Sequence, residues 1–137
     1  MTNCTFGNPA TLADFACLKN SIPTVAVLGV GSLGKEHARI YSELAAANLV
    51  KFAGVHDTVA DTAHRISRRF GVQAFNSVAE AADACDALNI VTPTRTHFDL
   101  ARILLREGKH VLVEKPMTDN SVQATELVQL ALQNNRC

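Results

Sequence analysis

The sequence lacks a net charge, a membrane span and a secretory signal. Its 13 basic side chains are balanced by 13 acidic ones, so no excess of positive charge indicates nucleic acid as a partner. No apolar run is long enough to span a bilayer, and the first residues lack the basic and apolar regions that direct secretion. We therefore expect a cytoplasmic protein that binds neither nucleic acid nor membrane.

The cysteines do not form a metal-binding pattern. The four cysteines include no CxxC pair, and their spacing to histidines is not that of zinc sites. The sequence therefore predicts no metal. It indicates reduced, mostly structural thiols at Cys4, Cys17, Cys85 and Cys137.

Short apolar runs alternate with helical segments from Pro23 onward. This alternation is typical of a parallel sheet covered on both faces, and 137 residues suffice for one domain with a real core. We predict strands at 24–28, 50–55, 73–75, 87–91 and 110–113, and helices near 33–47, 59–70, 77–84, 95–107 and 119–134. Gly71 and Gly108 follow two of these helices, each after cations in the last turn. The predicted fold class is α/β, a Rossmann-type doubly wound parallel sheet of about five strands.

A glycine turn, residues 29–34, joins the first predicted strand to the helix after it. Gly29 permits the tight turn, Gly31 lets a diphosphate approach the main chain, and Gly34 lets the helix pack near its strand. Main-chain amides and the partial positive charge of the helix start, about half an elementary charge, favour an anion without any lysine. The pattern predicts a dinucleotide site at Gly29, Gly31, Ser32, Leu33 and Gly34. An ordinary glycine-rich turn is the alternative.

Asp57 follows the second predicted strand, at the position of a ribose acceptor. A carboxylate there accepts hydrogen bonds from the adenosine ribose and repels the extra phosphate of NADP, so we predict NAD over NADP. The alternatives are a turn former before Thr58 or the N-cap of the next helix.

Residues 1–22 precede the alternating pattern, so we divide the chain into an N-terminal extension and a cofactor-binding domain at 23–137. Asn8 and Pro9 could open a short helix with one apolar face. The extension is then either an arm docked on the domain or a flexible leader.

The fourth predicted strand runs into a TP loop, and the fifth ends in an EKP segment. Both lie at carboxyl ends of strands, where ligands bind in open α/β sheets. These segments are Thr92, Pro93 and Thr94, and Glu114, Lys115 and Pro116. Together with the glycine turn and Asp57, they closely resemble the Gfo/Idh/MocA family of NAD(P)-dependent oxidoreductases, and the resemblance extends from about Thr24 to the C-terminus. EKP after GKHVLV is its specific signal.

The resemblance implies reversible hydride transfer between C4 of nicotinamide and a hydroxyl-bearing carbon of a sugar, cyclitol or related polyol. Lys115 would lie beside the reacting oxygen, where an ammonium stabilises a developing alkoxide and can shuttle a proton. A surface lysine at a strand end is the alternative. Glu114 would orient Lys115 or contact the nicotinamide ribose, and Thr92 and Pro93 would line the cofactor. The peptide before Pro116 is often cis in the family, and we expect it to be cis here.

Two histidines have no role that the sequence fixes. His97 could reach the cofactor or substrate, but as a first-turn residue of an apolar helix it could equally be structural. His37 matches a common family feature. Because nothing in its spacing gives it a chemical role, we favour a packed helix residue.

Family members continue into a sixth strand and a second α/β domain that supplies much of the substrate pocket. This sequence ends about where the sixth strand would begin. We therefore expect the cofactor half of an enzyme, with weak NAD binding and little dehydrogenase activity by itself. The run 110–113 would then be an apolar sheet edge, which predicts self-association into a homo-oligomer.

Two other classes of protein share part of this pattern. A non-catalytic dinucleotide sensor needs the glycine turn and Asp57 but has no evident need for Lys115. An S-adenosylmethionine-dependent methyltransferase shares the glycine-rich turn and an acidic residue after the second strand. The TP loop and the EKP segment argue against it.

Overall fold

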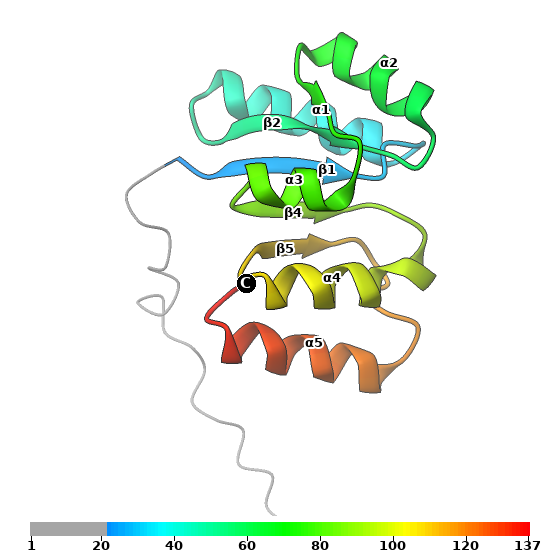
Figure 1. Cartoon of the computed structure of the whole chain (residues 1–137), viewed down its shortest axis with the longest axis vertical. Helices are drawn as coiled ribbons and strands as arrows, with labels where there is room; N and C mark the ends of the chain where they lie inside the picture. The colour runs from blue at the N-terminus through cyan, green and yellow to red at the C-terminus, as the bar shows by residue number, and fades with distance from the viewer. Residues whose placement is uncertain (1–21) are drawn as a thin grey trace, which may run out of the picture.

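The computed structural model describes residues 22–137, and the helix predicted after Asn8 lies outside the described residues. Strands and helices alternate along the described chain (Figure 1). The strands are β1 (Thr24–Leu28), β2 (Lys51–His56), β3 (Gln73–Ala74), β4 (Ala87–Ile90) and β5 (His110–Val113). The helices are α1 (Gly34–Ala46), α2 (Ala60–Phe70), α3 (Val78–Ala84), the 3₁₀ turn η2 (Thr94–Thr96), α4 (His97–Arg106) and α5 (Ser121–Gln133).

All strand pairs are parallel, and the strands lie in the order β3-β2-β1-β4-β5. The chain runs outward from β1 to β3 and then crosses back to place β4 on the other side of β1. This reversal opens a crevice at the carboxyl ends of β1 and β4, which is the ligand position in doubly wound sheets. The predicted Rossmann-type sheet of five strands is confirmed.

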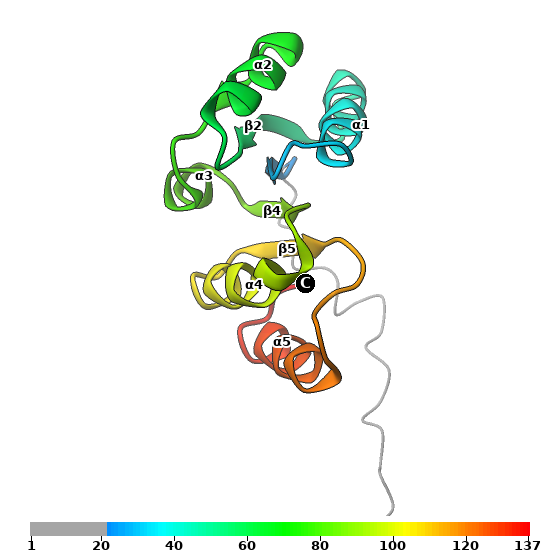
Figure 2. The same ribbon diagram turned by 90° about the vertical axis from the view of Figure 1, so that its right-hand side faces the viewer.

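The central strand β1 holds the two layers of the molecule together, because its side chains are buried on both faces of the sheet. Val27 packs with Ala38 of α1 and Ile66 of α2. On the opposite face, Leu28 packs with a second cluster that includes Leu104 of α4. Figure 2 shows α1 on one side of the sheet and α3 and α4 on the other.

The predicted helix ends after α2 and α4 are confirmed. Gly71 and Gly108 adopt φ angles of 67° and 74°, in the left-handed region. The start of the fourth helix differs from its prediction at residue 95. The main-chain amide of Thr96 donates to the carbonyl of Pro93 at 2.9 Å, so these residues close a 3₁₀ turn and α4 begins at His97.

The described cysteines, Cys85 and Cys137, are free thiols. Cys85 is buried in the cluster around Leu28. Burial raises the pKa of its thiol to about 11, which keeps the group protonated and unreactive at neutral pH.

Strand β5 lies at an edge of the sheet, as predicted. The prediction that its main-chain groups are unpaired is wrong in part. The amide of Val111 donates to the carbonyl of Cys137 at 2.8 Å, and the amide of Cys137 donates to Nδ1 of His110 at 3.1 Å. The last residue of the sequence therefore lies along β5. Within residues 22–137, no helix has the length and apolar character needed to cross a membrane.

Candidate functional site

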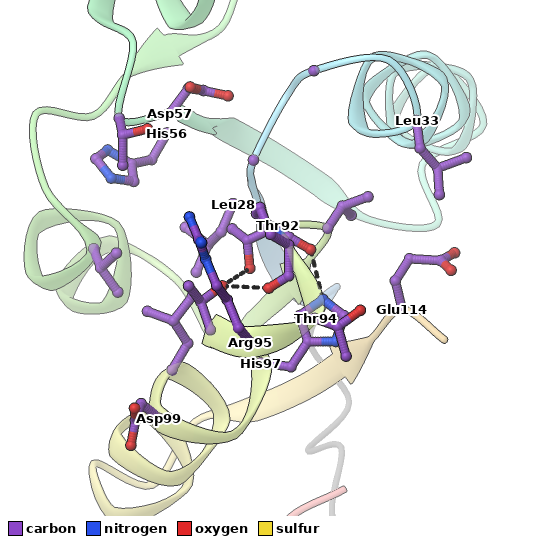
Figure 3. Close-up of a pocket in the computed structure, with 18 of the residues that line it drawn as sticks. Leu28, Leu33, His56, Asp57, Thr92, Thr94, Arg95, His97, Asp99 and Glu114 are labelled. Atoms are coloured by element: carbon purple, nitrogen blue, oxygen red, sulfur yellow. Dashed lines mark hydrogen bonds between the residues drawn. The ribbon is translucent and has the colours of Figure 1, made fainter. Parts of the chain in front are cut away.

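A cavity of about 830 Å³ lies across the carboxyl ends of β1, β2, β4 and β5 (Figure 3). It brings together residues predicted from four separate segments of the sequence. Those that line it are Gly29, Gly31, Leu33, Asp57, Thr92, Pro93, Thr94, His97, Glu114 and Lys115. The other predicted site residues, Ser32, Gly34 and Pro116, are adjacent in sequence to this lining but are not part of it.

The glycine turn can keep its conformation only without side chains at two positions. Gly29 has a φ of +83°, and a Cβ there would lie 2.8 Å from the carbonyl oxygen of Val91. A Cβ on Gly34 would lie 1.8 Å from the carbonyl oxygen of Gly29, so α1 could not start this close to β1. At Gly31, by contrast, a Cβ would meet nothing within 4 Å. The open space above Gly31 fits a diphosphate against the main chain.

The N-terminus of α1 is not closed by a side chain. Ser77 accepts a hydrogen bond from the third amide of α3, and Asn120 does so for α5. Among the described residues, no side chain does this for α1, whose N-cap is Leu33. The first turn of α1 therefore keeps its partial positive charge available to an anion in the cavity.

Asp57 joins the glycine turn to the start of α2. Its Oδ2 accepts a hydrogen bond from the amide of Val30 at 2.9 Å, and its Oδ1 accepts one from the amide of Val59 at 2.9 Å. The second bond makes it a turn former, and the N-cap of α2 is Val59 itself. Because a carboxylate has about four acceptor positions, these two bonds leave room for ribose hydroxyls. The turn and this acid together fit an adenine dinucleotide.

His97 ties the TP loop to the EKP segment. His97 is 1% exposed, with Nε2 2.7 Å from the carbonyl oxygen of Thr92 and Nδ1 3.0 Å from that of Pro116. Both ring nitrogens thus face the main chain. Of the two roles that the sequence allowed, this geometry supports the structural one.

The EKP segment ends β5 and carries the expected cis peptide between Lys115 and Pro116. Oε2 of Glu114 accepts a hydrogen bond from the main-chain amide of Lys115 at 3.0 Å. Its Oε1 lies 3.0 Å from Nε2 of His37. The Lys115 side chain is exposed at the cavity, so its amine is available to a bound molecule.

The cavity has lining residues that the sequence did not single out. Arg95 extends from η2 toward His56 and Asp57 in Figure 3. His56 is anchored through its Nδ1, which lies 3.0 Å from the carbonyl oxygen of Phe75. His56 is the last residue of β2, and Arg95 directly follows the TP loop; these positions are the signal that could have indicated both residues.

His37 is also more than the packed helix residue that we favoured. It contacts Asn89 of β4 as well as Glu114, with Nδ1 2.8 Å from Nδ2 of Asn89. Helical spacing could not indicate these contacts, because Asn89 comes from β4 and Glu114 directly follows β5.

Known proteins resemble this chain in both sequence and structure. The model of the oxidoreductase family with an NAD-binding Rossmann fold matches residues 24–137. UDP-N-acetylglucosamine 3-dehydrogenase of Acidithiobacillus ferrooxidans is 38% identical over 105 residues, which cover 77% of this chain and 32% of that protein. Inositol 2-dehydrogenase of Rhizobium meliloti is 40% identical over 93 residues, which cover 66% of this chain and 27% of that protein.

Solved structures agree with the sequence comparison. The A. ferrooxidans enzyme GnnA superposes with a TM-score of 0.78 at 35% identity, over 84% of this chain and 36% of that one. GenD2 from gentamicin A biosynthesis, solved in complex with NAD, gives a TM-score of 0.78 at 29% identity, over 85% of this chain and 33% of that one. The chain thus spans about a third of the length of the relatives it matches. It belongs to the Gfo/Idh/MocA oxidoreductase family and forms the NAD-binding Rossmann fold of that family.

Proposed function

We propose that this chain is the cofactor-binding part of a dehydrogenase that acts on a hydroxyl-bearing carbon of a sugar, cyclitol or related polyol. The observation that carries the proposal is that Lys115 and the glycine turn lie along one cavity. A dinucleotide sensor has no evident need for a lysine at this end. The relatives named above are dehydrogenases of a nucleotide sugar and of inositol, which supports this class of substrate.

Different residues along the cavity bind different parts of the cofactor. The glycine turn and the start of α1 hold the diphosphate through main-chain amides, and Asp57 accepts hydrogen bonds from the adenosine ribose. Thr92, Pro93 and Thr94 form the wall beside the cofactor. When bound, NAD supplies the hydride acceptor at C4 of nicotinamide.

Lys115 is the residue to which we assign proton transfer. Its amine takes the hydroxyl proton when substrate is oxidised and returns it when substrate is reduced. As an ammonium, it also stabilises negative charge on the reacting oxygen. Glu114 is held by the Lys115 amide, and it directs the lysine or accepts a hydrogen bond from the nicotinamide ribose.

The test separates cofactor binding from turnover. NADH is titrated into the chain and followed by the fluorescence of nicotinamide itself, since the protein has no tryptophan. We expect saturable binding that K115M leaves unchanged. In the full-length enzyme that carries this domain, K115M should lower turnover by about a thousandfold.

The matched control is K51M, which removes an exposed lysine from the first residue of β2, at the opposite end of the strand from the cavity. Neither binding nor turnover should change. Full turnover in K115M would remove this lysine from the mechanism, whereas a chain that binds no NADH would end the proposal altogether.

We also propose that the edge strand β5 mediates self-association with a second copy. Its Leu112 is 55% exposed. Cys137 covers this edge at the amide of Val111, and the rest of the edge presents main-chain groups to another strand. Sedimentation velocity over a range of concentrations should show a dimer that L112K weakens. A strictly monomeric wild-type chain would contradict this assignment.

A further inference from the structure

Asn89, His37 and Glu114 form a chain of side-chain hydrogen bonds that ends at the main chain of Lys115. Nδ2 of Asn89 lies 2.8 Å from Nδ1 of His37. Nε2 of His37 lies 3.0 Å from Oε1 of Glu114, and Oε2 of Glu114 accepts from the Lys115 amide at 3.0 Å. This series of hydrogen bonds links β4, α1 and the end of β5.

The orientation of the Asn89 amide, whose nitrogen faces His37, indicates the tautomer of the histidine. An amide nitrogen only donates, so Nδ1 of His37 accepts and carries no proton. The proton of the neutral ring is then on Nε2, which donates to Glu114. The alternative neutral tautomer would leave two acceptors facing each other at Oε1.

Asn89 is buried, and among the described residues only one of its two side-chain polar atoms has a hydrogen-bond partner. Its residue is 1% exposed, and its Oδ1 finds no hydrogen-bond partner among residues 22–137. Burying an amide is costly unless it is hydrogen-bonded. The contact to His37 is the side-chain hydrogen bond that the structure shows for it.

We infer that His37 is a positioning residue for the EKP segment. It holds one oxygen of Glu114 so that the other fixes the Lys115 amide, and thereby the direction in which the lysine leaves β5. Because α1 also begins at the glycine turn, His37 connects the diphosphate end of the site to the lysine end. This inference rests on the proposed function for its consequence, but its geometry can be tested without turnover.

The first test needs no variant. Nitrogen-15 spectra of the His37 ring in the wild-type chain, recorded at mildly alkaline pH, report which nitrogen carries the proton. We expect the neutral form with the proton on Nε2. A neutral ring with the proton on Nδ1 cannot donate to Glu114 and would overturn the inference.

The second test compares two ligands. ADP contains the adenosine and the diphosphate but neither nicotinamide nor its ribose, so its binding reports the glycine turn and Asp57 but not the EKP segment. We expect H37L to weaken NADH binding roughly tenfold and to leave ADP binding unchanged, because Glu114 then loses the donor that holds its carboxylate for the nicotinamide ribose. The Lys115 amide resonance should move in H37L. H37Q, which keeps a donor for Glu114, should restore more than half of the lost affinity.

The matched control is R39Q on the same helix. Arg39 is exposed and pairs with Glu36 and Glu43 of α1, so both ligands should bind as in the wild type. Unchanged NADH affinity and an unmoved Lys115 resonance in H37L would overturn the inference. If H37L loses ADP binding as well, the variant is misfolded. The inference is then judged by the ring tautomer of the wild type and by the NADH affinity of H37Q. Absence of NADH binding by the wild type would instead refute the proposed function.

Discussion

The two ends of the cavity are built in different ways. The diphosphate end consists of main chain: a glycine turn in which Gly29 and Gly34 approach neighbouring carbonyl groups too closely for a side chain. The lysine end consists of side chains from several elements, with His97 between two loops and His37 between Asn89 and Glu114. The first end depends on local conformation, and the second depends on tertiary contacts.

This difference explains which changes each end can tolerate. A main-chain site fails when a side chain blocks it, whatever the chemistry of that side chain. A side-chain network fails when a donor or acceptor loses its partner, even if the replacement has the same volume. Substitutions can therefore separate the two ends.

The largest effect is expected from a methyl group at the diphosphate end. G34A would place a Cβ 1.8 Å from the Gly29 carbonyl oxygen, so the start of α1 must shift, at a cost of about 3 kcal/mol or more. Chemical denaturation measures this loss. The control is G31A, whose Cβ meets nothing within 4 Å; it should keep its stability but bind NADH at least about tenfold more weakly. Equal stability of the two variants would contradict the steric account.

The lysine end should break through loss of a donor. H97L roughly keeps the volume of the buried ring. It removes the ring nitrogens that contact the carbonyl oxygens of Thr92 and Pro116. We expect a loss of about 2 kcal/mol in the free energy of unfolding. H64L, at an exposed histidine of α2, is the control and should stay within about 0.5 kcal/mol of wild type. A stable H97L would show that these contacts do not hold the loops together.

Asp57 sharpens the comparison because it is a side chain that serves the main-chain end. D57N keeps one acceptor oxygen but removes the negative charge that we expect to repel the extra phosphate of NADP. The ratio of NADPH to NADH affinity should rise about tenfold, measured by calorimetry. An unchanged ratio would show that another group sets the preference for NAD.

The smallest effect concerns pH. Burial, together with the nearby charge of Arg136, lowers the pKa of His110 despite the opposing influence of Asp86. The folded state therefore binds this proton less readily than the unfolded state, and stability falls as the pH drops through the usual titration range of histidine. H110N should flatten that part of the stability curve, as urea midpoints at several pH values would show. An identical slope in wild type and H110N would contradict the assignment.

Much of the fold was readable from the sequence because it follows local rules. The strands have strong apolar runs, and Gly71 and Gly108 mark helix ends where the structure has left-handed residues. The start of α4 was misplaced because the residues after Pro93 satisfy their hydrogen bonds in a 3₁₀ turn. Residue propensity does not distinguish a 3₁₀ turn from the first turn of an α-helix well.

The site was readable to the same extent. The glycine turn, Asp57 and the EKP segment are contiguous motifs, and the structure places them along one cavity. The role of His37 was not readable, because its partner Asn89 lies 52 positions away in the sequence. Only the strand order, with β4 and β5 beside β1, brings these side chains together.

The central claim is that one NAD molecule lies along the cavity from the glycine turn to Lys115. The most direct measurement is an NADH titration followed by the amide resonances of Gly31 and Lys115. The account predicts that NADH moves both resonances with one affinity, and that ADP moves Gly31 alone. If saturating NADH left both resonances in place, or moved Lys115 without Gly31, the account would be contradicted.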